Sequence, residues 1–308
     1  MIAALRVAVD LYDLHRWFGD DYRQVLDIAK LADEIGIDEI TVTDHVIMGE
    51  AVDQYPYGTF RPPLDYPWFE PLVTLAAIAG VTNRVGLTTG VAISPLRPAV
   101  LLAKQLASLD VLSRGRLSVG VGTGWQKAEY DASGVPWDGR YARFEEQIRV
   151  CKLLWAVSPA SFSGDTVQFE RLHAYPRPYR RDAIPVWFGL APTERNCRRI
   201  AELGDGWVPI VQKPDEIAAG VAAIGAAFER AGRDPKTLGV RVMPEIVFDR
   251  AGRADLGATL AHVPALHAAG ATTIVGIPSL FCSGPDGIRA FLQELVHARD
   301  SLAARSAG

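Results

Sequence analysis

Apolar runs of strand type alternate with helical patterns along almost the whole chain. The first run, Arg6–Leu11, precedes apolar residues at helical spacing over Tyr22–Ile35, and the same order then recurs. In all, the 308 residues contain eight strand-like runs and eight helical patterns. Such alternation predicts parallel strands joined by right-handed crossovers. Eight units in roughly 300 residues fit a closed (β/α)8 barrel, or TIM barrel, better than an open doubly wound sheet.

No linker rich in glycine or serine separates these units, so we expect a single domain over residues 1–308. The expected strands are Arg6–Leu11, Glu39–Thr43, Val85–Ile93, Arg116–Val121, Pro185–Gly189, Gly206–Val211, Val240–Phe248 and Thr272–Ile277. The expected helices are Tyr22–Ile35, Glu70–Gly80, Pro98–Leu112, Arg143–Val157, Thr193–Leu203, Pro214–Ala231, Leu256–Ala269 and Gly287–Ala304, and a short hairpin is expected at Ser161–Leu172.

Two inserts are longer than the connections of a minimal barrel. They span Met48–Trp68, which is rich in proline and aromatic residues, and Trp125–Pro185. Both follow the carboxyl end of an expected strand, and active sites of such barrels are built at that face. We therefore interpret the inserts as covers over a substrate site.

Composition excludes several classes of partner. The formal net charge is −4, with no basic surface of the kind that nucleic acid or an anionic membrane requires. No apolar run approaches the roughly 18 residues that span a bilayer, and the N-terminus alternates like a strand instead of a secretion signal. Three scattered cysteines favour a reducing compartment over a disulfide framework. We expect a cytoplasmic protein that acts on a small molecule.

The triplet Thr43-Asp44-His45 ends the second expected strand. Polar groups at the mouth of a barrel are costly to bury unless they are used, so His45 is a candidate for a histidine set against a reacting ring. The alternative is that Asp44 caps a turn and His45 lies on the surface. The residues alone support both interpretations equally. No motif with metal-ligand spacing accompanies them, so no metal site is expected.

Glycine-rich strand ends follow in two places. Ser118–Trp125 lacks the spacing of a dinucleotide fingerprint, and its glycines favour a flat ring lying against bare backbone. Pro185–Thr193 runs from a strand into a helix, with Thr193 as a candidate N-cap and free N–H groups that suit a phosphate. A lone glycine-rich strand end such as Ser118–Trp125 is weak evidence for phosphate binding, and an ordinary strand-to-helix turn is the alternative for Pro185–Thr193.

Taken in order, these segments resemble the bacterial-luciferase-like superfamily. The resemblance rests on TDH at 43–45, on TTGVAISPLRPAVLLAKQLASLDVLSRGRLSVGVGTGW at 88–125, and on PVWFG at 185–189 with LGDGWVP at 203–209. It implies a barrel mouth that binds FMN or the deazaflavin F420, with a non-proline cis peptide at Gly90–Val91. The residues implied to contact the cofactor are Asp44, His45, Thr89, Gly90, Val91, Gly122, Thr123, Gly124 and Trp125, with Gly189, Leu190, Ala191 and Pro192 near its phosphate.

The sequence departs from the family pattern at three positions. Leu190 stands where a second adjacent glycine is common, which places the phosphate contacts in doubt. Gly49 and Trp125 stand where the sugar-phosphate dehydrogenase branch has tryptophan and glutamate, so glucose 6-phosphate is not expected as the substrate. Glu129, one turn later, is the candidate replacement for that glutamate as the catalytic general acid.

The resemblance implies an oxidoreductase that transfers hydride between F420 and a small organic substrate. The combination of TDH, TTGV and GTGW in a chain rich in arginine and alanine favours F420 over FMN. One alternative is an FMN-dependent monooxygenase supplied with reduced flavin by a partner, and another is a non-catalytic protein that carries a flavin or deazaflavin. Family members are often dimers, so a homodimer is expected.

Overall fold

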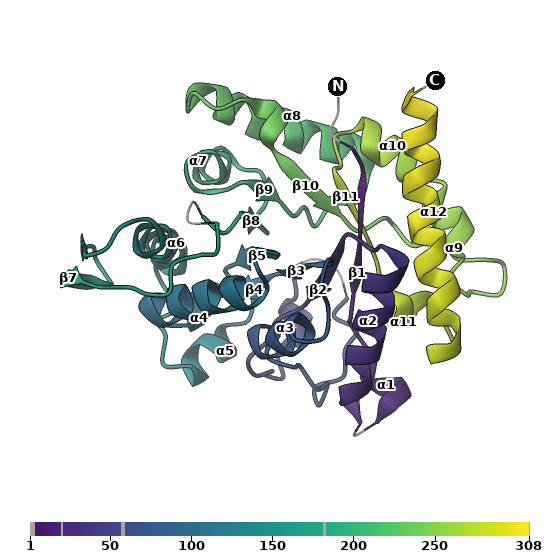
Figure 1. Cartoon of the computed structure of the whole chain (residues 1–308), viewed down its shortest axis with the longest axis horizontal. Helices are drawn as coiled ribbons and strands as arrows, with labels where there is room; N and C mark the ends of the chain where they lie inside the picture. Colours follow the sequence, from purple (N-terminus) through teal and green to yellow (C-terminus); the bar gives the residue numbers. More distant parts are fainter. Residues whose placement is uncertain (1–3, 20, 57–58, 181–182, 308) are drawn as a thin grey trace.

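Eight parallel strands close into a barrel in the computed structural model, which describes residues 4–19, 21–56, 59–180 and 183–307 (Figure 1). Neighbouring strands follow the order β3-β2-β1-β11-β10-β9-β8-β5, and pairing of β3 with β5 closes the ring. The strands are β1 (Arg6–Asp10), β2 (Glu39–Val42), β3 (Gly86–Thr89), β5 (Leu117–Gly122), β8 (Val186–Phe188), β9 (Gly206–Trp207), β10 (Gly239–Val242) and β11 (Thr273–Gly276). The predicted (β/α)8 barrel is confirmed.

The helices surround these strands (Figure 1). Their bounds are α1 (His15–Phe18), α2 (Val25–Ile35), α3 (Pro71–Ala79), α4 (Ala99–Leu112), α5 (Lys127–Ala132), α6 (Arg140–Ala156), α7 (Glu194–Leu203), α8 (Pro214–Arg230), α9 (Leu256–Leu260), α10 (Val263–Ala268), α11 (Pro278–Phe281) and α12 (Ile288–Ala307). Short 3-10 turns are η1 (Tyr22–Gln24), η2 (Val52–Gln54), η3 (Ser94–Leu96), η4 (Pro235–Thr237) and η5 (Pro285–Gly287). None of the described helices is long and apolar enough to cross a membrane.

Two predicted elements are interrupted. The run predicted as one strand over Val85–Ile93 divides into β3 and β4 (Ala92–Ile93), separated by a cis peptide between Gly90 and Val91. The helix predicted over Leu256–Ala269 divides into α9 and α10. Pro264 explains the second break, because proline has no N–H to donate to the carbonyl of Leu260 and its ring collides with that group.

The second insert contains structure that the sequence analysis did not predict. The helix α5 lies just after β5, and α6 begins three residues earlier than the predicted Arg143. The predicted hairpin is confirmed as β6 (Ala160–Ser163) paired antiparallel with β7 (Gln168–Leu172), outside the barrel. The strands β9 and β10 are shorter than the strands predicted at Gly206–Val211 and Val240–Phe248.

A buried ion pair crosses the interior of the barrel near its amino-terminal end. Arg241 of β10 donates to Oε2 of Glu39 on β2 at 2.6 Å, although β2 and β10 are not neighbours in the sheet. The Arg241 guanidinium also lies 4.3 Å from the centre of the Trp187 ring, and Arg6 contacts Oε1 of Glu39 at 2.7 Å. Because the pair spans the ring, the side chains of Glu39 and Arg241 point into the barrel.

Opposite charge decides the ionisation of Glu39. Burial by itself would raise the pKa of this carboxyl, but the charges of Arg241 and Arg6 and the hydrogen bond from Arg241 outweigh burial and hold the pKa below its usual value. The ionised pair is therefore the form that the barrel interior contains at neutral pH. Removing one partner leaves the other charge buried and uncompensated, which is the expensive case.

Replacing Glu39 by alanine is expected to lower the free energy of unfolding by about 3–5 kcal/mol, because Arg241 then stays buried without a counter-charge. Urea unfolding at neutral pH measures the loss. Asp131→Ala is the matched control, since it removes an exposed carboxylate that contacts Lys127 at 2.6 Å and should cost less than about 1 kcal/mol. Equal losses in the two variants would contradict the assignment of Glu39 as a buried structural charge.

Candidate active site

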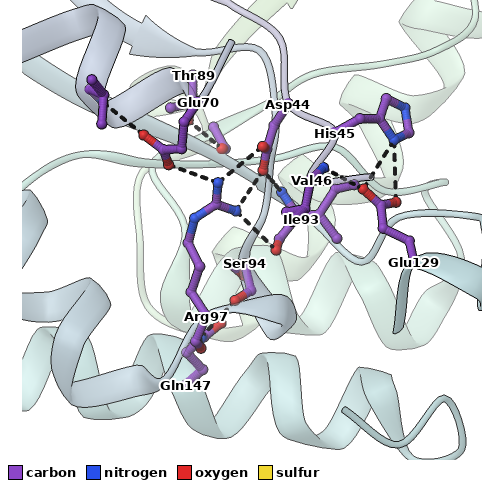
Figure 2. A network of polar contacts seen from close by, with 12 residues as sticks. Asp44, His45, Val46, Glu70, Thr89, Ile93, Ser94, Arg97, Glu129 and Gln147 are labelled. Atoms are coloured by element: carbon purple, nitrogen blue, oxygen red, sulfur yellow. Dashed lines mark hydrogen bonds and ion pairs between the residues drawn. The ribbon is translucent and has the colours of Figure 1, made fainter. Parts of the chain in front are cut away.

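Asp44 follows β2 at the carboxyl end of the barrel and has protein partners for both carboxylate oxygens (Figure 2). Oδ2 accepts hydrogen bonds from the N–H of Ile93 at 2.7 Å and from Nη1 of Arg97 at 2.6 Å. Oδ1 accepts from Nη2 of Arg97 at 3.0 Å. The Asp44 side chain is thus engaged by Arg97 in a bidentate pair, the strongest geometry for such contacts. Its role in this structure is to anchor the strand end that carries His45.

Arg97 links this pair to two helices. Its Nη2 also contacts Oε1 of Glu70 at 2.8 Å, and Glu70 caps α3 by accepting the N–H of Val73. Gln147 of α6 donates to the carbonyl oxygens of Arg97 at 2.6 Å and of Ser94 at 2.8 Å. Burial by itself would lower the pKa of Arg97, but the hydrogen bonds and charges of Asp44 and Glu70 raise it. The guanidinium therefore stays charged, and the sequence analysis did not identify its role.

His45 lies beside Glu129 of α5 (Figure 2). Nδ1 of His45 is 3.2 Å from Oε2 and 3.3 Å from Oε1 of the carboxylate. The Glu129 side chain is fully buried and also accepts the N–H of Val46 at 2.6 Å. No described residue makes a hydrogen bond to Nε2 of His45. The two residues predicted to be catalytic are thus in contact, in an arrangement where Glu129 orients the ring and leaves Nε2 available.

Aromatic rings from both inserts cover His45. The ring of Trp68 lies 4.7 Å away between centroids, Trp125 lies 6.1 Å away and Phe60 lies 6.2 Å away, all with their planes steeply inclined to the imidazole. Tyr55 extends the cluster by contacting Phe60 at 5.5 Å and Trp125 at 5.1 Å. As a result the His45 side chain is only 11% exposed. The prediction that the inserts cover the site stays a prediction, but they do meet over His45.

The glycines of β5 permit close packing of its backbone. A Cβ atom on Gly120 would lie 2.2 Å from the carbonyl oxygen of Thr89, and one on Gly122 would lie 2.9 Å from a methyl group of Val91. On Gly124 it would lie 2.8 Å from Ile93. Packing of β5 against the segment around the Gly90–Val91 cis peptide thus accounts for these glycines, and a bound ring is not needed to explain them. The cis peptide itself was implied by the family resemblance and is confirmed.

The first turns of α7, which follows β8, include a buried side-chain donor without a partner among the described residues. Thr193 is the N-cap, as predicted, and its side chain accepts the N–H of Asn196 at 3.3 Å. Asn196 in turn donates to the carbonyl of Ala191 and accepts from Nη1 of Arg199. Nε of Arg199 contacts Glu145 at 2.9 Å, but Nη2 is buried with no partner among the described residues. Leu190 is buried, and its carbonyl accepts from the Trp207 indole at 2.8 Å.

A further carboxyl, Asp10, ends β1 at the same face and was missed by the sequence analysis. It is 6% exposed, accepts the hydroxyl of Thr41, and accepts the N–H of Tyr12 at 2.8 Å. Burial raises its pKa to about 6, against an opposing effect of those two hydrogen bonds. The signal was available, since an acid at the carboxyl end of an apolar run is the same signal that drew attention to Asp44.

Comparison with known proteins identifies the family. The model of the family described as luciferase-like monooxygenase matches residues 4–256, which is most of the chain. The chain belongs to this family. Among curated relatives of this luciferase-like protein, an uncharacterised protein of Mycobacterium tuberculosis is 38% identical over 193 residues, covering 62% of this chain and 67% of the relative. Members of the family are oxidoreductases, and we conclude that this chain is an enzyme of that broad class.

Solved structures with the same fold include a monooxygenase and an F420-dependent reductase, according to their descriptions. Monooxygenase RslO1 from Streptomyces bottropensis superposes with a TM-score of 0.76 at 20% identity, covering 94% of this chain and 97% of its own. The coenzyme F420-dependent tetrahydromethanopterin reductase from Methanopyrus kandleri superposes with a TM-score of 0.71 at 15% identity. The superposition covers 96% of this chain and 99% of the reductase. At these identities the likeness concerns the fold of the luciferase-like chain.

The stability of this luciferase-like protein should depend on the ionisation of Asp10. Its pKa is raised from 3.8 to about 6 by folding, so ionisation opposes folding. The penalty is absent below about pH 4, grows as the pH rises, and is complete above about pH 6, where it reaches roughly 3 kcal/mol. Asp10→Asn cannot ionise and keeps an acceptor for Tyr12. We expect this variant to be more stable than the native protein at pH 8 and equal to it at pH 4.

Thermal or urea unfolding at the two pH values tests this expectation. Asp138→Asn serves as the control, because Asp138 is an exposed aspartate of the second insert. A stability difference for Asp10→Asn that does not change between pH 4 and pH 8 would show that the Asp10 carboxyl is not perturbed by burial.

Proposed function

We propose that the protein is an F420-dependent oxidoreductase that transfers hydride between F420 and a small organic substrate. The observation that carries this proposal is the His45–Glu129 pair at the barrel mouth, with Nε2 of His45 available and aromatic rings above it. In a hydride-transfer enzyme the cofactor supplies the two-electron chemistry, and the protein supplies orientation and a group that stabilises or protonates the reacting centre. We assign that second role to His45, with Glu129 as its positioning residue.

The residues of this site fit a phosphate-bearing, flavin-type cofactor. The buried Nη2 of Arg199 has no partner in the described structure, and it belongs to the helix that starts at Thr193. A guanidinium donor beside a capped helix start suits a phosphate group. Gly189 to Pro192 and Arg199 would hold the phosphate, and Thr89 to Val91, Gly122 to Trp125 and Asp44 with His45 would line the ring.

The choice of F420 over FMN rests on the family resemblance and on the F420-dependent neighbour. The family description and the Streptomyces structure instead favour a monooxygenase, for which we propose FMN as the cofactor, as the second candidate. The two candidates differ in a property that is simple to measure, namely which cofactor the purified protein binds.

A fluorescence titration of the purified protein with F420, and separately with FMN, decides between them. The chain has seven tryptophans, and Trp125 and Trp68 lie over the proposed ring site. We expect F420 to quench the protein fluorescence at lower concentration than FMN does. Trp125→Phe should reduce the quenching, whereas Trp155→Phe should not, because Trp155 is buried on α6 and bonded to Ala103. Tighter binding of FMN would replace this proposal with the monooxygenase.

His45→Ala is expected to bind the cofactor with nearly unchanged affinity and to lose about 10²–10⁴-fold in the rate of hydride transfer, the usual contribution of a positioned acid–base group. Glu129→Gln, which keeps an acceptor for the N–H of Val46, should lose less. The measurement is oxidation of bound reduced F420 by a panel of small ketones and aldehydes. Equal rates for native protein and His45→Ala would support a non-catalytic carrier of the cofactor.

A further inference from the structure

Asp10 points into the upper part of the barrel interior. The side chain of Glu39 is directed inward, as its contact with Arg241 across the ring shows. Side chains on a strand alternate between faces, so Thr41, two residues after Glu39, is also directed inward. Asp10 is the register partner of Thr41, and the Thr41 hydroxyl donates to Oδ2 of Asp10. The carboxyl therefore belongs to the inner layer at the carboxyl ends of the strands, where the catalytic face of a barrel lies.

No side chain separates Asp10 from the segment proposed to contact the cofactor ring. A Cβ atom on Gly90 would lie 3.5 Å from Oδ2 of Asp10 and 3.0 Å from the hydroxyl of Thr41. Because residue 90 is glycine, the wall of the mouth at this point consists of backbone with the carboxyl directly behind it. The absence of a side chain at Gly90 therefore leaves the Asp10 carboxyl next to the backbone of this segment, whereas the glycines of β5 serve close packing of strands.

Asp10 differs from the other carboxyls of the mouth in its partners. Asp44 is paired with Arg97, and Glu129 contacts His45 and the N–H of Val46. No ion pair involves Asp10 in the described part of the chain, and its two donors are a hydroxyl and an N–H. Two phenols are affected by its charge: burial raises the pKa of Tyr12 to about 12 and also raises that of Tyr22, and the charge of Asp10 adds to both shifts. Among these three groups, Asp10 is the one whose pKa burial raises toward neutral pH.

A small cavity lies at the carboxyl ends of β1 and β2. Its volume of about 20 Å³ is large enough for one water molecule. Among the residues that line it are Tyr12, which comes after β1, and Thr43, which comes after β2. It shares Tyr22, Pro67 and Phe69 with a surface groove of about 700 Å³ beside α2 and α3. The rings of Tyr22 and Phe69 stack at 3.7 Å between the two spaces. Leu11 and Tyr12, which directly follow Asp10, line the smaller space, and Asp10 itself lines neither.

We propose that Asp10 is a second acid–base group of this enzyme, which gives a proton to the substrate when hydride is delivered and takes it back in the reverse direction. The assignment rests on the proposed function. In the reducing direction, the unsaturated carbon of a carbonyl or imine substrate gains the hydride, and the electron pair of the double bond moves to the oxygen or nitrogen. That atom then gains the proton of the Asp10 carboxyl, which becomes a carboxylate and is reprotonated by solvent. The substrate is reduced and the cofactor is oxidised by two electrons.

The test follows the carboxyl itself. Protein labelled with ¹³C at the aspartate side chains is titrated by NMR in three states: free, with oxidised cofactor and with reduced cofactor, using F420 and FMN in parallel. The Asp10 resonance is assigned by its loss in Asp10→Asn. We expect the titration midpoint of Asp10 to lie near 6 in the free protein. It should also differ by about one pKa unit or more, a tenfold change in proton affinity, between the oxidised and reduced complexes.

Asp110 is the internal control in the same spectra. It is also buried, its pKa is raised by burial, and it accepts the N–H of Tyr179 at 2.7 Å, but it lies on the outer helix α4. Its midpoint should be the same in all three states. A purely structural Asp10 would behave like Asp110, so an Asp10 midpoint that ignores the redox state of a bound cofactor overturns the assignment.

Variants give a second, independent measurement. The rate of hydride transfer to a ketone should fall as the pH rises through the Asp10 midpoint, because only the protonated carboxyl gives up a proton. Asp10→Asn should bind the cofactor like native protein, lose most of the rate and lack this pH dependence, and Asp10→Glu should restore part of both. An unchanged pH profile in Asp10→Asn overturns the assignment. Binding of neither cofactor overturns the proposed function and this inference together, which the fluorescence titration detects in the same samples.

Discussion

Pairing of β3 with β5 closes the sheet, and the rest of the structure depends on that closure. A closed parallel sheet has an inside, so every strand must divide its residues between an interior layer and the surrounding helices. It also gathers the carboxyl ends of all the strands at one mouth, although the residues that meet there come from distant parts of the chain. The close approach of Gly120 to Thr89 is one condition for this closure, since any side chain at position 120 would collide with the backbone of the neighbouring strand.

Charged side chains lie at two levels of the barrel, near its amino-terminal end and at its mouth. Near the amino-terminal end, Glu39 and Arg241 neutralise each other across the ring, and both side chains are buried. At the mouth, Asp44 is held by Arg97, which ties the end of β2 to α3 through Glu70 and to the start of α4. Also at the mouth, His45 contacts Glu129, and Asp10 has no ion pair among the described residues. The catalytic roles that we propose at the mouth therefore fall to His45 and Asp10, which the Asp44–Arg97 pair does not involve.

Much of the fold was predictable because it follows from local patterns. Apolar periodicity located all eight barrel strands, and Thr193 announced the start of α7. The helix break at Pro264 could also have been predicted from the chain. The site was predicted less completely. His45 and Glu129 were named for separate reasons, and their contact across 84 positions was not foreseen. The glycines of Ser118–Trp125 predicted a ring lying against bare backbone, and that stays a prediction, because close packing against Val91, Ile93 and the Thr89 carbonyl also accounts for them.

The sequence by itself determined the class of fold, the family and the strand ends where polar residues gather, because these depend on periodicity and on motifs a few residues long. Only the tertiary structure decided which carboxyl has which partner. Asp44 is bonded to Arg97, Glu129 to His45, and Asp10 to a hydroxyl and an N–H. Whether a buried acid is a fixed charge or a proton donor depends on the opposite charge within a few ångströms of it. That distance is set by closure of the barrel and not by position along the chain.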